Sequence, residues 1–467
     1  MTKLAMNVSD EQPSSNGRTA NGYSRAASSE ASTNDLSAFE HIESGVRSYI
    51  RQWPAVFTRG RGHLLWDEDD KEYIDLFAGA GTLNYGHNNP VLKQALLDYL
   101  VEDNIVHGLD MGTVAKRDFL ECFDELILKP RGLDYVVQFP GPTGTNAVEA
   151  ALKLARKATG REWMISFTNA FHGMTLGALA LTGNDMKRGG GGVPLQYATS
   201  MPYDGFFDDE RAVGAIEYLR MFLAADGSGL DAPAAIIVET VQGEGGVNVA
   251  SMEFLRALRE TATEHGALLI VDDIQMGNGR TGKFFSFEEA GIEPDIVCIS
   301  KSISGYGLPM ALTLFKRDLD IWGPGEHNGT FRGNNPAFVT ATKTLQTYWS
   351  DDTLSREVEK KGKVLRERLE RIADAYPEAQ ATWRGRGLIQ GLHMNVEGLA
   401  QEVIEEAFRR GVIVETSGPT SDVVKFLPSL TIPQDELLRG AGIIEESLRD
   451  VLAERGLRSK VLTTAGR

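Results

Sequence analysis

Two stretches of the sequence decide the fold, residues 267–275 (ALLIVDDIQ) and residues 294–307 (PDIVCISKSISGYG). Each begins as a short apolar run that is typical of a buried strand, and each ends on charged or small residues. Strands of this kind are also predicted at residues 135–139, 164–168, 235–241 and 311–315, and amphipathic helices at 146–159, 252–265 and 335–349. This alternation predicts an α/β domain in which helices cover both faces of a mostly parallel sheet.

The pattern changes near residue 351. Long charged helices are predicted at 352–375, 399–410 and 434–455, with short strands at 388–393, 412–415 and 423–427. We therefore expect a large α/β domain over 104–350 and a smaller α+β domain over 351–467, with the segment 38–103 packing against the smaller one. Residues 1–37 are rich in small polar residues and have no hydrophobic periodicity, which predicts a disordered extension.

Composition excludes several classes of protein. The 467 residues contain 48 Lys and Arg against 65 Asp and Glu, and the resulting formal charge of −17 disfavours a nucleic-acid partner. No apolar stretch approaches the ~18 residues of a transmembrane helix, so no membrane partner is expected. The only cysteines, Cys122 and Cys298, form no CxxC pair, which predicts neither a disulfide framework nor a thiolate metal site and fits a cytoplasmic location.

A possible phosphate site follows the first predicted strand. Residues 139–150 (FPGPTGTNAVEA) pass from a strand through glycine into a helix, where Gly144 and Thr145 would offer unpaired N–H groups. The alternative is an ordinary strand-to-helix turn with Thr143 or Thr145 as N-cap. A nicotinamide enzyme is disfavoured because the dinucleotide glycine fingerprint is incomplete.

Asp272 and Lys301 stand where two apolar strands end. A buried carboxylate needs a cationic or donor partner, although Asp272 and Asp273 could also simply cap the next turn. Desolvation lowers the pKa of a lysine and favours imine chemistry. A phosphate cradle, an anion for a ring nitrogen and an imine-forming amine are together what pyridoxal 5'-phosphate (PLP) requires.

Five motifs also carry a family resemblance, namely DDIQxGxGRTG from Asp272, PDI before Lys301, ExxQGEGG from Glu239, FHG from Phe171 and GTFxGN from Gly329. In this order and spacing, over about residues 39–452, the chain resembles the class III aminotransferases of PLP fold type I. The resemblance implies a large domain with a mostly parallel seven-stranded sheet and a small α+β domain formed by both chain ends. It also implies a homodimer or larger homo-oligomer whose active sites are shared between subunits.

The resemblance assigns roles around the cofactor ring. Lys301 would anchor PLP and then move a proton at the substrate carbon, and Asp272 would pair with the pyridine nitrogen. Gln275 would contact the phenolic oxygen, Phe171 would stack on the ring, and His172 would lie beside it. As alternatives, Phe171 could be plain core and His172 a satisfied polar side chain.

The resemblance also assigns the phosphate contacts. The N–H groups of Gly144 and Thr145 would hold the phosphate, and Thr330 would reach it from the other subunit, unless Thr330 is only a turn residue. Potassium dependence is implied as well, without a located site.

Three further stretches, residues 77–89, 129–135 and 324–335, are most similar to family members that exchange the terminal amino group of L-2,4-diaminobutyrate with 2-oxoglutarate in ectoine biosynthesis. In relatives acting on terminal amines, a glutamate pairs with an arginine and releases it for the keto acid. Glu244 matches the glutamate, but Lys425 stands at the arginine's position. We expect Lys425 to neutralise Glu244 in one half-reaction and to bind the keto acid's carboxylate in the other, unless it is a surface lysine on an edge strand.

Several functions stay open at this level. The substrate could be ornithine, acetylornithine or 4-aminobutyrate, or the enzyme could supply diaminobutyrate for siderophore or peptide synthesis. A catalytically silent PLP-fold binding protein is the alternative from another class.

Overall fold

The computed structural model describes residues 34–191, 195–207 and 214–457. Its centre is a seven-stranded sheet in the order β4-β12-β11-β10-β7-β5-β6. The strands are β4 (Tyr135–Gln138), β5 (Met164–Phe167), β6 (Ala198–Met201), β7 (Ala235–Val238), β10 (Leu268–Asp272), β11 (Ile296–Ile299) and β12 (Leu312–Lys316). Only β12 runs antiparallel to its neighbours, β11 and β4, so the predicted mostly parallel sheet is confirmed.

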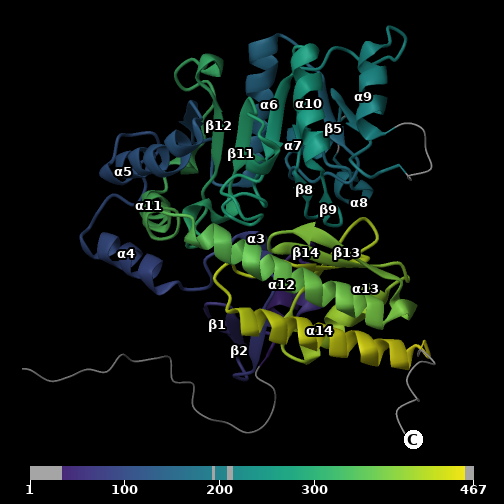
Figure 1. Cartoon of the computed structure of the whole chain (residues 1–467). Helices are drawn as coiled ribbons and strands as arrows, with labels where there is room; N and C mark the ends of the chain where they lie inside the picture. Colours follow the sequence, from purple (N-terminus) through teal and green to yellow (C-terminus); the bar gives the residue numbers. More distant parts are fainter. Residues whose placement is uncertain (1–33, 192–194, 208–213, 458–467) are drawn as a thin grey trace, which may run out of the picture.

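Helices bury both faces of this sheet (Figure 1). Ile270 of β10 belongs to an apolar cluster with Ala151 of α6 (Gly144–Thr159), whereas its neighbour Leu269 belongs to a cluster with Leu258 of α10 (Met252–Glu264). Successive strand residues thus point to opposite faces, and both faces are apolar because each meets a helix. Shorter helices near this sheet are α7 (Leu176–Ala180), α8 (Asp185–Arg188) and α9 (Ala215–Ala224).

A smaller unit lies below the large sheet in Figure 1. Its antiparallel sheet has the order β13 (Ala381–Arg386), β14 (Ile389–Met394), β17 (Val423–Phe426), β16 (Glu415–Ser417). Another sheet has the order β1 (Phe57–Arg61), β2 (Leu64–Asp67), β3 (Glu72–Asp75), β15 (Val412–Ile413), which joins the two chain ends as expected. The long helices here are α12 (Thr353–Ala375), α13 (Leu399–Arg409) and α14 (Gln434–Glu454).

Two predicted strands are shorter than expected. The run 235–241 is not one strand, because β7 ends at Val238 and β8 (Val241–Gln242) pairs with β9 (Asn248–Val249) in a separate hairpin. The run 412–415 is divided between β15 and β16, which belong to different sheets. In the first case the chain leaves the large sheet at the polar residues Glu239 and Thr240. In the second it changes sheet inside an apolar run, where hydrophobicity alone does not mark the exit.

The segment 38–103 is not uniform. Its strands join the smaller unit, but α4 (Pro90–Val101) packs against α11 (Asn335–Tyr348), which also contacts α5 (Val114–Phe123). The four domain limits therefore stay a prediction. The predicted extension lies outside the described residues over 1–33, and at its end Asn34 Oδ1 accepts a 2.6 Å hydrogen bond from the Val56 N–H.

The remaining elements are short, and no helix within the described ranges is both long and apolar enough to cross a membrane. They are α1 (Ser37–His41), α2 (Tyr49–Gln52), α3 (Ala78–Gly81), η1 (Asp124–Leu128), η2 (Lys129–Arg131), η3 (Glu288–Ala290), η4 (Lys301–Ser304), η5 (Arg317–Leu319), η6 (Thr330–Arg332) and η7 (Pro377–Ala379).

Candidate active site

A cavity of about 320 Å³ lies at the carboxyl ends of the parallel strands. It is lined by Thr143, Gly144, Thr145, Phe171, His172, Gly173, Met174, Glu239, Glu244, Asp272, Ile274, Gln275, Met276 and Lys301. All of the predicted site residues except Thr330 and Lys425 are in this wall. They meet here because parallel strands place their carboxyl ends at one edge of a sheet, where ligands bind in open α/β folds.

Lys301 follows β11 directly and begins the short helix η4. Its backbone has a φ of +51°, a left-handed conformation that side-chain-bearing residues rarely adopt and that often occurs at functional sites. Its Nζ donates a 2.8 Å hydrogen bond to the Ala80 carbonyl. Burial lowers the pKa of Lys301, and the nearby Glu244 only partly opposes this. A larger fraction of the amine is therefore neutral and able to act as a nucleophile or base.

Asp272 ends β10 and is almost completely buried. Its Oδ2 lies 2.7 Å from Nδ1 of the buried His172, and its Oδ1 accepts a 3.2 Å hydrogen bond from the Ile274 N–H. Burial would lower the pKa of His172, but the hydrogen bond to Asp272 and its negative charge raise it overall. Asp272 thus caps the next turn with one oxygen and is oriented by His172 with the other, while its carboxylate remains in the cavity wall.

The predicted phosphate cradle is the first turn of α6, where N–H groups have no partner within the helix. Asn146 Oδ1 accepts hydrogen bonds from both the N–H and the hydroxyl of Thr143, so Thr143 does act as N-cap residue. Gly144 is closely packed, since a Cβ there would lie 2.9 Å from the Ile274 side chain and would force it to shift. The turn is therefore capped in the ordinary way, and its use as a phosphate cradle stays a prediction.

Gln275 and Phe171 complete the wall around the expected ring. Gln275 Nε2 donates 3.1 Å hydrogen bonds to the Ala80 carbonyl and to Glu244 Oε1. The Phe171 N–H donates a 2.9 Å hydrogen bond to Glu239, and its ring is only partly buried at the cavity. A ring in that position is not plain core.

Lys425 lies behind Glu244, in β17. Because β17 is an interior strand and the Lys425 side chain is fully buried, the alternative of a surface lysine on an edge strand is wrong. Its Nζ forms ion pairs with Glu244 at 2.8 Å and with Glu415 at 2.9 Å. Burial alone would raise the pKa of Glu244, but Lys425, Lys301 and the hydrogen bond from Gln275 together outweigh it and hold that pKa well below its usual range.

Glu415 was not predicted from the sequence. Burial raises its pKa, and its Oε2 accepts a 3.3 Å hydrogen bond from the Tyr49 hydroxyl. The available signal was a single acidic residue at the end of the apolar run 411–415 (GVIVE). A charge in such a run indicates a buried partner.

Two further buried carboxyls surround the cavity. Burial raises the pKa of Glu239, which lines the wall, to about 8. Burial likewise raises the pKa of Asp273 to about 7, against hydrogen bonds from Ser286. Asp272 and Asp273 are adjacent in sequence but point to different surroundings, so only Asp272 is presented to the cavity.

Thr330 is not in the wall of its own chain's cavity but in η6. Its contact with a phosphate in another subunit stays a prediction. The neighbouring segments are held together by a bridge between His107 and Asn334 and by an ion pair of Arg332 with Asp110.

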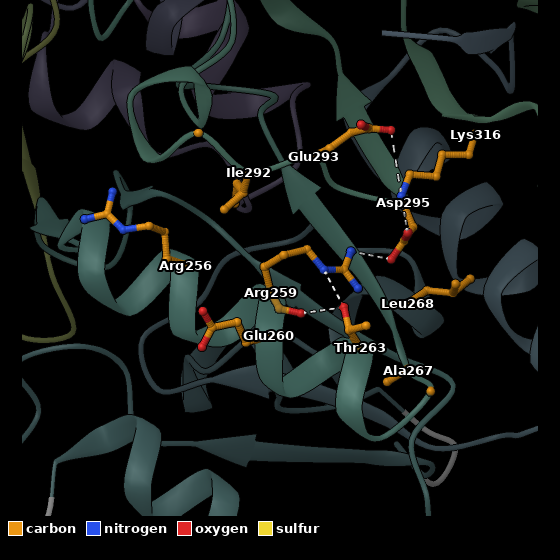
Figure 2. Close-up of a pocket in the computed structure, with 12 residues that line it drawn as sticks. Arg256, Arg259, Glu260, Thr263, Ala267, Leu268, Ile292, Glu293, Asp295 and Lys316 are labelled. Carbon is orange, nitrogen blue, oxygen red and sulfur yellow. Dashed lines mark hydrogen bonds and ion pairs between the residues drawn. The ribbon is translucent and has the colours of Figure 1, made fainter. Parts of the chain in front are cut away.

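A larger hollow of about 680 Å³ lies at the opposite edge of the same sheet (Figure 2). Its charged side chains are already paired. Asp295 lies 2.6 Å from Arg259 and 2.9 Å from Lys316, while Arg256 and Glu260 form ion pairs with residues outside the lining, Glu253 and Arg220. It contains none of the predicted site residues. Size alone therefore does not identify the site, and the smaller cavity is the candidate.

Comparison with known proteins identifies the family of the chain. A family model described as aminotransferase class-III matches residues 47–448. The chain belongs to this family. Two relatives of this aminotransferase are named diaminobutyrate–2-oxoglutarate transaminase. The protein from Sporosarcina pasteurii is 57% identical and the alignment covers 90% of this chain and 98% of that protein, and the protein from Streptomyces coelicolor is 59% identical over 89% and 98%.

Solved structures share the fold of this aminotransferase. The ornithine aminotransferase of Toxoplasma gondii has a TM-score of 0.78 at 26% identity, covering 90% of this chain and 95% of that one. An amine transaminase from an uncultivated Pseudomonas species, solved in a PLP-bound form, has a TM-score of 0.76 at 26% identity, covering 89% and 98%. The predicted fold class is thereby confirmed.

Proposed function

We propose that this class III aminotransferase exchanges the terminal amino group of L-2,4-diaminobutyrate with 2-oxoglutarate, interconverting these with L-aspartate 4-semialdehyde and L-glutamate. The observation that carries the proposal is similarity over nearly the whole length of relatives that bear this activity in their names. The site is compatible with it, because the cavity contains an amine for chemistry, and a glutamate in its wall shields a second cation.

The cofactor in this proposal is PLP, which supplies an aldehyde that bonds to amines and a ring that withdraws electrons from the substrate carbon. The residues present fit it. Gly144 and Thr145 offer N–H groups to a phosphate, Phe171 offers a ring face, and the Asp272 carboxylate lies at the wall, where it can face a ring nitrogen. Lys301 would supply the amine for a covalent link to PLP.

Lys301, His172 and Ala80 have separate roles in the proposed reaction. Lys301 would take a proton from the substrate carbon and return it on the cofactor side of the reacting nitrogen. Burial lowers the pKa of Lys301 and so increases the share of neutral amine that can accept the proton. His172 holds Asp272 in one orientation, in which its carboxylate would pair with the ring nitrogen of PLP. The Lys301 amine is fixed in position by its hydrogen bond to the Ala80 carbonyl of the same chain. Ala80 lies in a strained turn, since its φ is +55°.

The two substrates need opposite states of one cation, which must be covered while the terminal amine reacts and exposed to the carboxylate of the keto acid. While Glu244 covers Lys425, the wall presents no free positive charge to a reacting carbon that bears no carboxylate. When Glu244 moves away, Lys425 can bind the carboxylate beside the keto group, and Glu415 keeps the buried ammonium paired meanwhile. Lysine lacks the two-pronged geometry of arginine, and the second carboxylate compensates by fixing its position.

We also propose a cytoplasmic homodimer or larger homo-oligomer, a place in ectoine biosynthesis and potassium dependence, all on the family resemblance. Support for a subunit interface near Thr330 comes from a group of exposed apolar side chains in the adjoining segments. They are Ile105, Val106, Met111, Val114 and Phe331. Contiguous exposed apolar surface commonly marks protein contacts. Light scattering on the purified protein tests the assembly, and omission of potassium from the assay tests the ion.

The activity is tested with a donor panel. The holoenzyme is supplied with 2-oxoglutarate and either diaminobutyrate, ornithine, acetylornithine or 4-aminobutyrate, and glutamate and the aldehyde product are both measured. We expect the highest kcat/KM with diaminobutyrate and no glutamate formation without PLP. A higher kcat/KM with another donor would replace the proposed substrate, and the absence of turnover with every donor would favour a binding protein.

A further inference from the structure

The proposed substrates share one feature that the site so far leaves without a partner. In diaminobutyrate the carboxylate lies the same number of carbon–carbon bonds from the reacting carbon as the distal carboxylate of 2-oxoglutarate does. Both half-reactions therefore bring a negative charge to the same distance from the chemistry. A single cation at that distance would serve both substrates.

The wall of the cavity does not supply such a cation. Lys301 is the only lysine or arginine among the lining residues, and its amine is used for the reaction. Glu244 and Asp272 add negative charge to the wall, and the imidazole of His172 is already held by Asp272. Lys425 is fully buried and already paired twice, and its proposed partner is the other carboxylate of the keto acid. A distal carboxylate entering here needs another positive charge.

Lys187 lies next to the cavity, and its ammonium forms no ion pair with another described residue. Its Nζ lies 4.2 Å from the centroid of the Phe171 ring, and it lines a small hollow that shares Phe171 and Glu244 with the cavity. Across the described residues its ammonium has no hydrogen bond and no ion pair, although most cations of this protein are paired. An aromatic face alone holds an ammonium by only about 0.5–1 kcal/mol at an exposed site, so Lys187 is free to bind an anion.

The backbone positions Lys187 rather than leaving it on a loose loop. It lies in α8, and its N–H donates a 3.0 Å hydrogen bond to the side chain of Asn184, the N-cap residue of that helix. Asn184 lines the same small hollow. The start of α8 thus turns the Lys187 side chain toward Phe171.

We propose that Lys187 binds the distal carboxylate of both substrates and so selects substrates by the distance between that carboxylate and the reacting carbon. This inference rests on the proposed function. It assigns the two carboxylates of 2-oxoglutarate to different cations, Lys425 near the reacting carbon and Lys187 at the far end.

The test compares Lys187→Met with Arg188→Met, which removes the same charge from the next position of α8. Loss of one charge-assisted contact should raise KM for diaminobutyrate and for 2-oxoglutarate about tenfold each, with kcat changed less than about twofold. With 1,3-diaminopropane, which is diaminobutyrate without its carboxylate, Lys187→Met and the unmodified enzyme should have equal KM values. Lys187→Arg should restore most of the affinity for the two natural substrates.

A binding measurement separates this inference from the proposed function. Glutarate carries both carboxylates but no keto group, and its dissociation constant from the holoenzyme should rise about tenfold in Lys187→Met and stay unchanged in Arg188→Met. Unchanged glutarate binding in Lys187→Met, or an equal loss in both variants, would overturn the role of Lys187. If the unmodified enzyme turned over neither natural substrate, the proposed function would fail, and glutarate would still decide the question for Lys187.

Discussion

The two ends of strands β10 and β11 carry the same kinds of groups in opposite arrangements. At the amino end, Asp295 is paired with Arg259 and Lys316 within 3 Å, and its Oδ2 also accepts a 2.7 Å hydrogen bond from the Leu269 N–H. At the carboxyl end, Asp272 and Lys301 are not paired with each other. Asp272 is held by His172, and the Lys301 amine is held by the backbone carbonyl of Ala80.

The comparison shows what makes a charged hollow a site. Groups that neutralise one another stabilise the fold and leave nothing for a ligand, even though the amino-end hollow is the larger one. Groups that are oriented but kept apart retain their capacity to bind and react, which is typical of functional sites.

The largest effect is expected from removing one lysine at each end of these strands. Lys301→Ala should lower kcat about 10,000-fold, the upper end for loss of an acid–base group, because the amine is both anchor and base. Lys316→Ala, the matched change at the amino end, should leave kcat and KM unchanged. Steady-state kinetics on both variants, with circular dichroism to confirm folding, measures this. A comparable loss of activity in Lys316→Ala would mean that the two ends are not functionally distinct.

Lys425→Met tests a lysine that lies near the cavity at the carboxyl end but is held in two ion pairs, as the charged groups at the amino end are. It strands two buried carboxylates, so the free energy of unfolding should fall by about 3–5 kcal/mol. In the enzyme that remains folded, KM for 2-oxoglutarate should rise about tenfold or more, beyond any rise for diaminobutyrate. Urea unfolding and kinetics measure the two effects. Lys425→Arg is the control that keeps the charge, and an unchanged KM for 2-oxoglutarate would remove Lys425 from substrate binding.

Asp295→Asn should affect stability without affecting catalysis. It removes the charge shared by Arg259 and Lys316, and a loss of about 1–3 kcal/mol in unfolding free energy is expected. The control is Glu293→Gln, whose 3.8 Å contact with Lys316 is half exposed and should contribute less than about 1 kcal/mol. Measured kcat/KM should be the same in both variants as in the unmodified enzyme, and a drop in either would link the amino end to the active site.

The smallest effect concerns Asp273, which follows Asp272 directly in the sequence but does not line the cavity. Burial raises its pKa in the folded protein to about 7, above the value near 3.9 expected after unfolding. The folded state therefore binds this proton more tightly, and the stabilisation is complete below the unfolded pKa and lost as the pH rises through about 7.

Asp273→Asn should consequently gain stability relative to the unmodified enzyme by about 1 kcal/mol per pH unit between roughly pH 5 and pH 7, and by no more above that. Urea unfolding of both proteins across this range measures the difference. A constant difference at all pH values would show that Asp273 does not titrate there.

Much of the fold could be predicted from the sequence. Apolar runs with helices between them mark strands that are buried on both faces, and those runs located the sheet together with Asp272 and Lys301 at its edge. The same reasoning wrongly carried one strand across Glu239 and Thr240 in 235–241. It also could not separate β15 from β16, because an apolar run has the same appearance whether its residues face one core or two.

The pairing of side chains across different sheets was beyond such reasoning. Glu415 pairs with Lys425 because β16 lies antiparallel beside β17 with these two residues opposite each other. Glu244 joins them from a hairpin of another sheet, and Lys187 comes close to Phe171 through the turn before α8. None of these contacts leaves a periodic trace in the sequence.

The sequence by itself determined the α/β class, the order of the strands along the chain and which of them carry the reactive amine and carboxylate, because hydrophobic periodicity and local motifs are properties of neighbouring residues. Only the tertiary structure decided which charges neutralise one another and which stay open to a ligand. That distinction depends on distances of a few ångströms between segments far apart in the chain, and packing alone sets those distances.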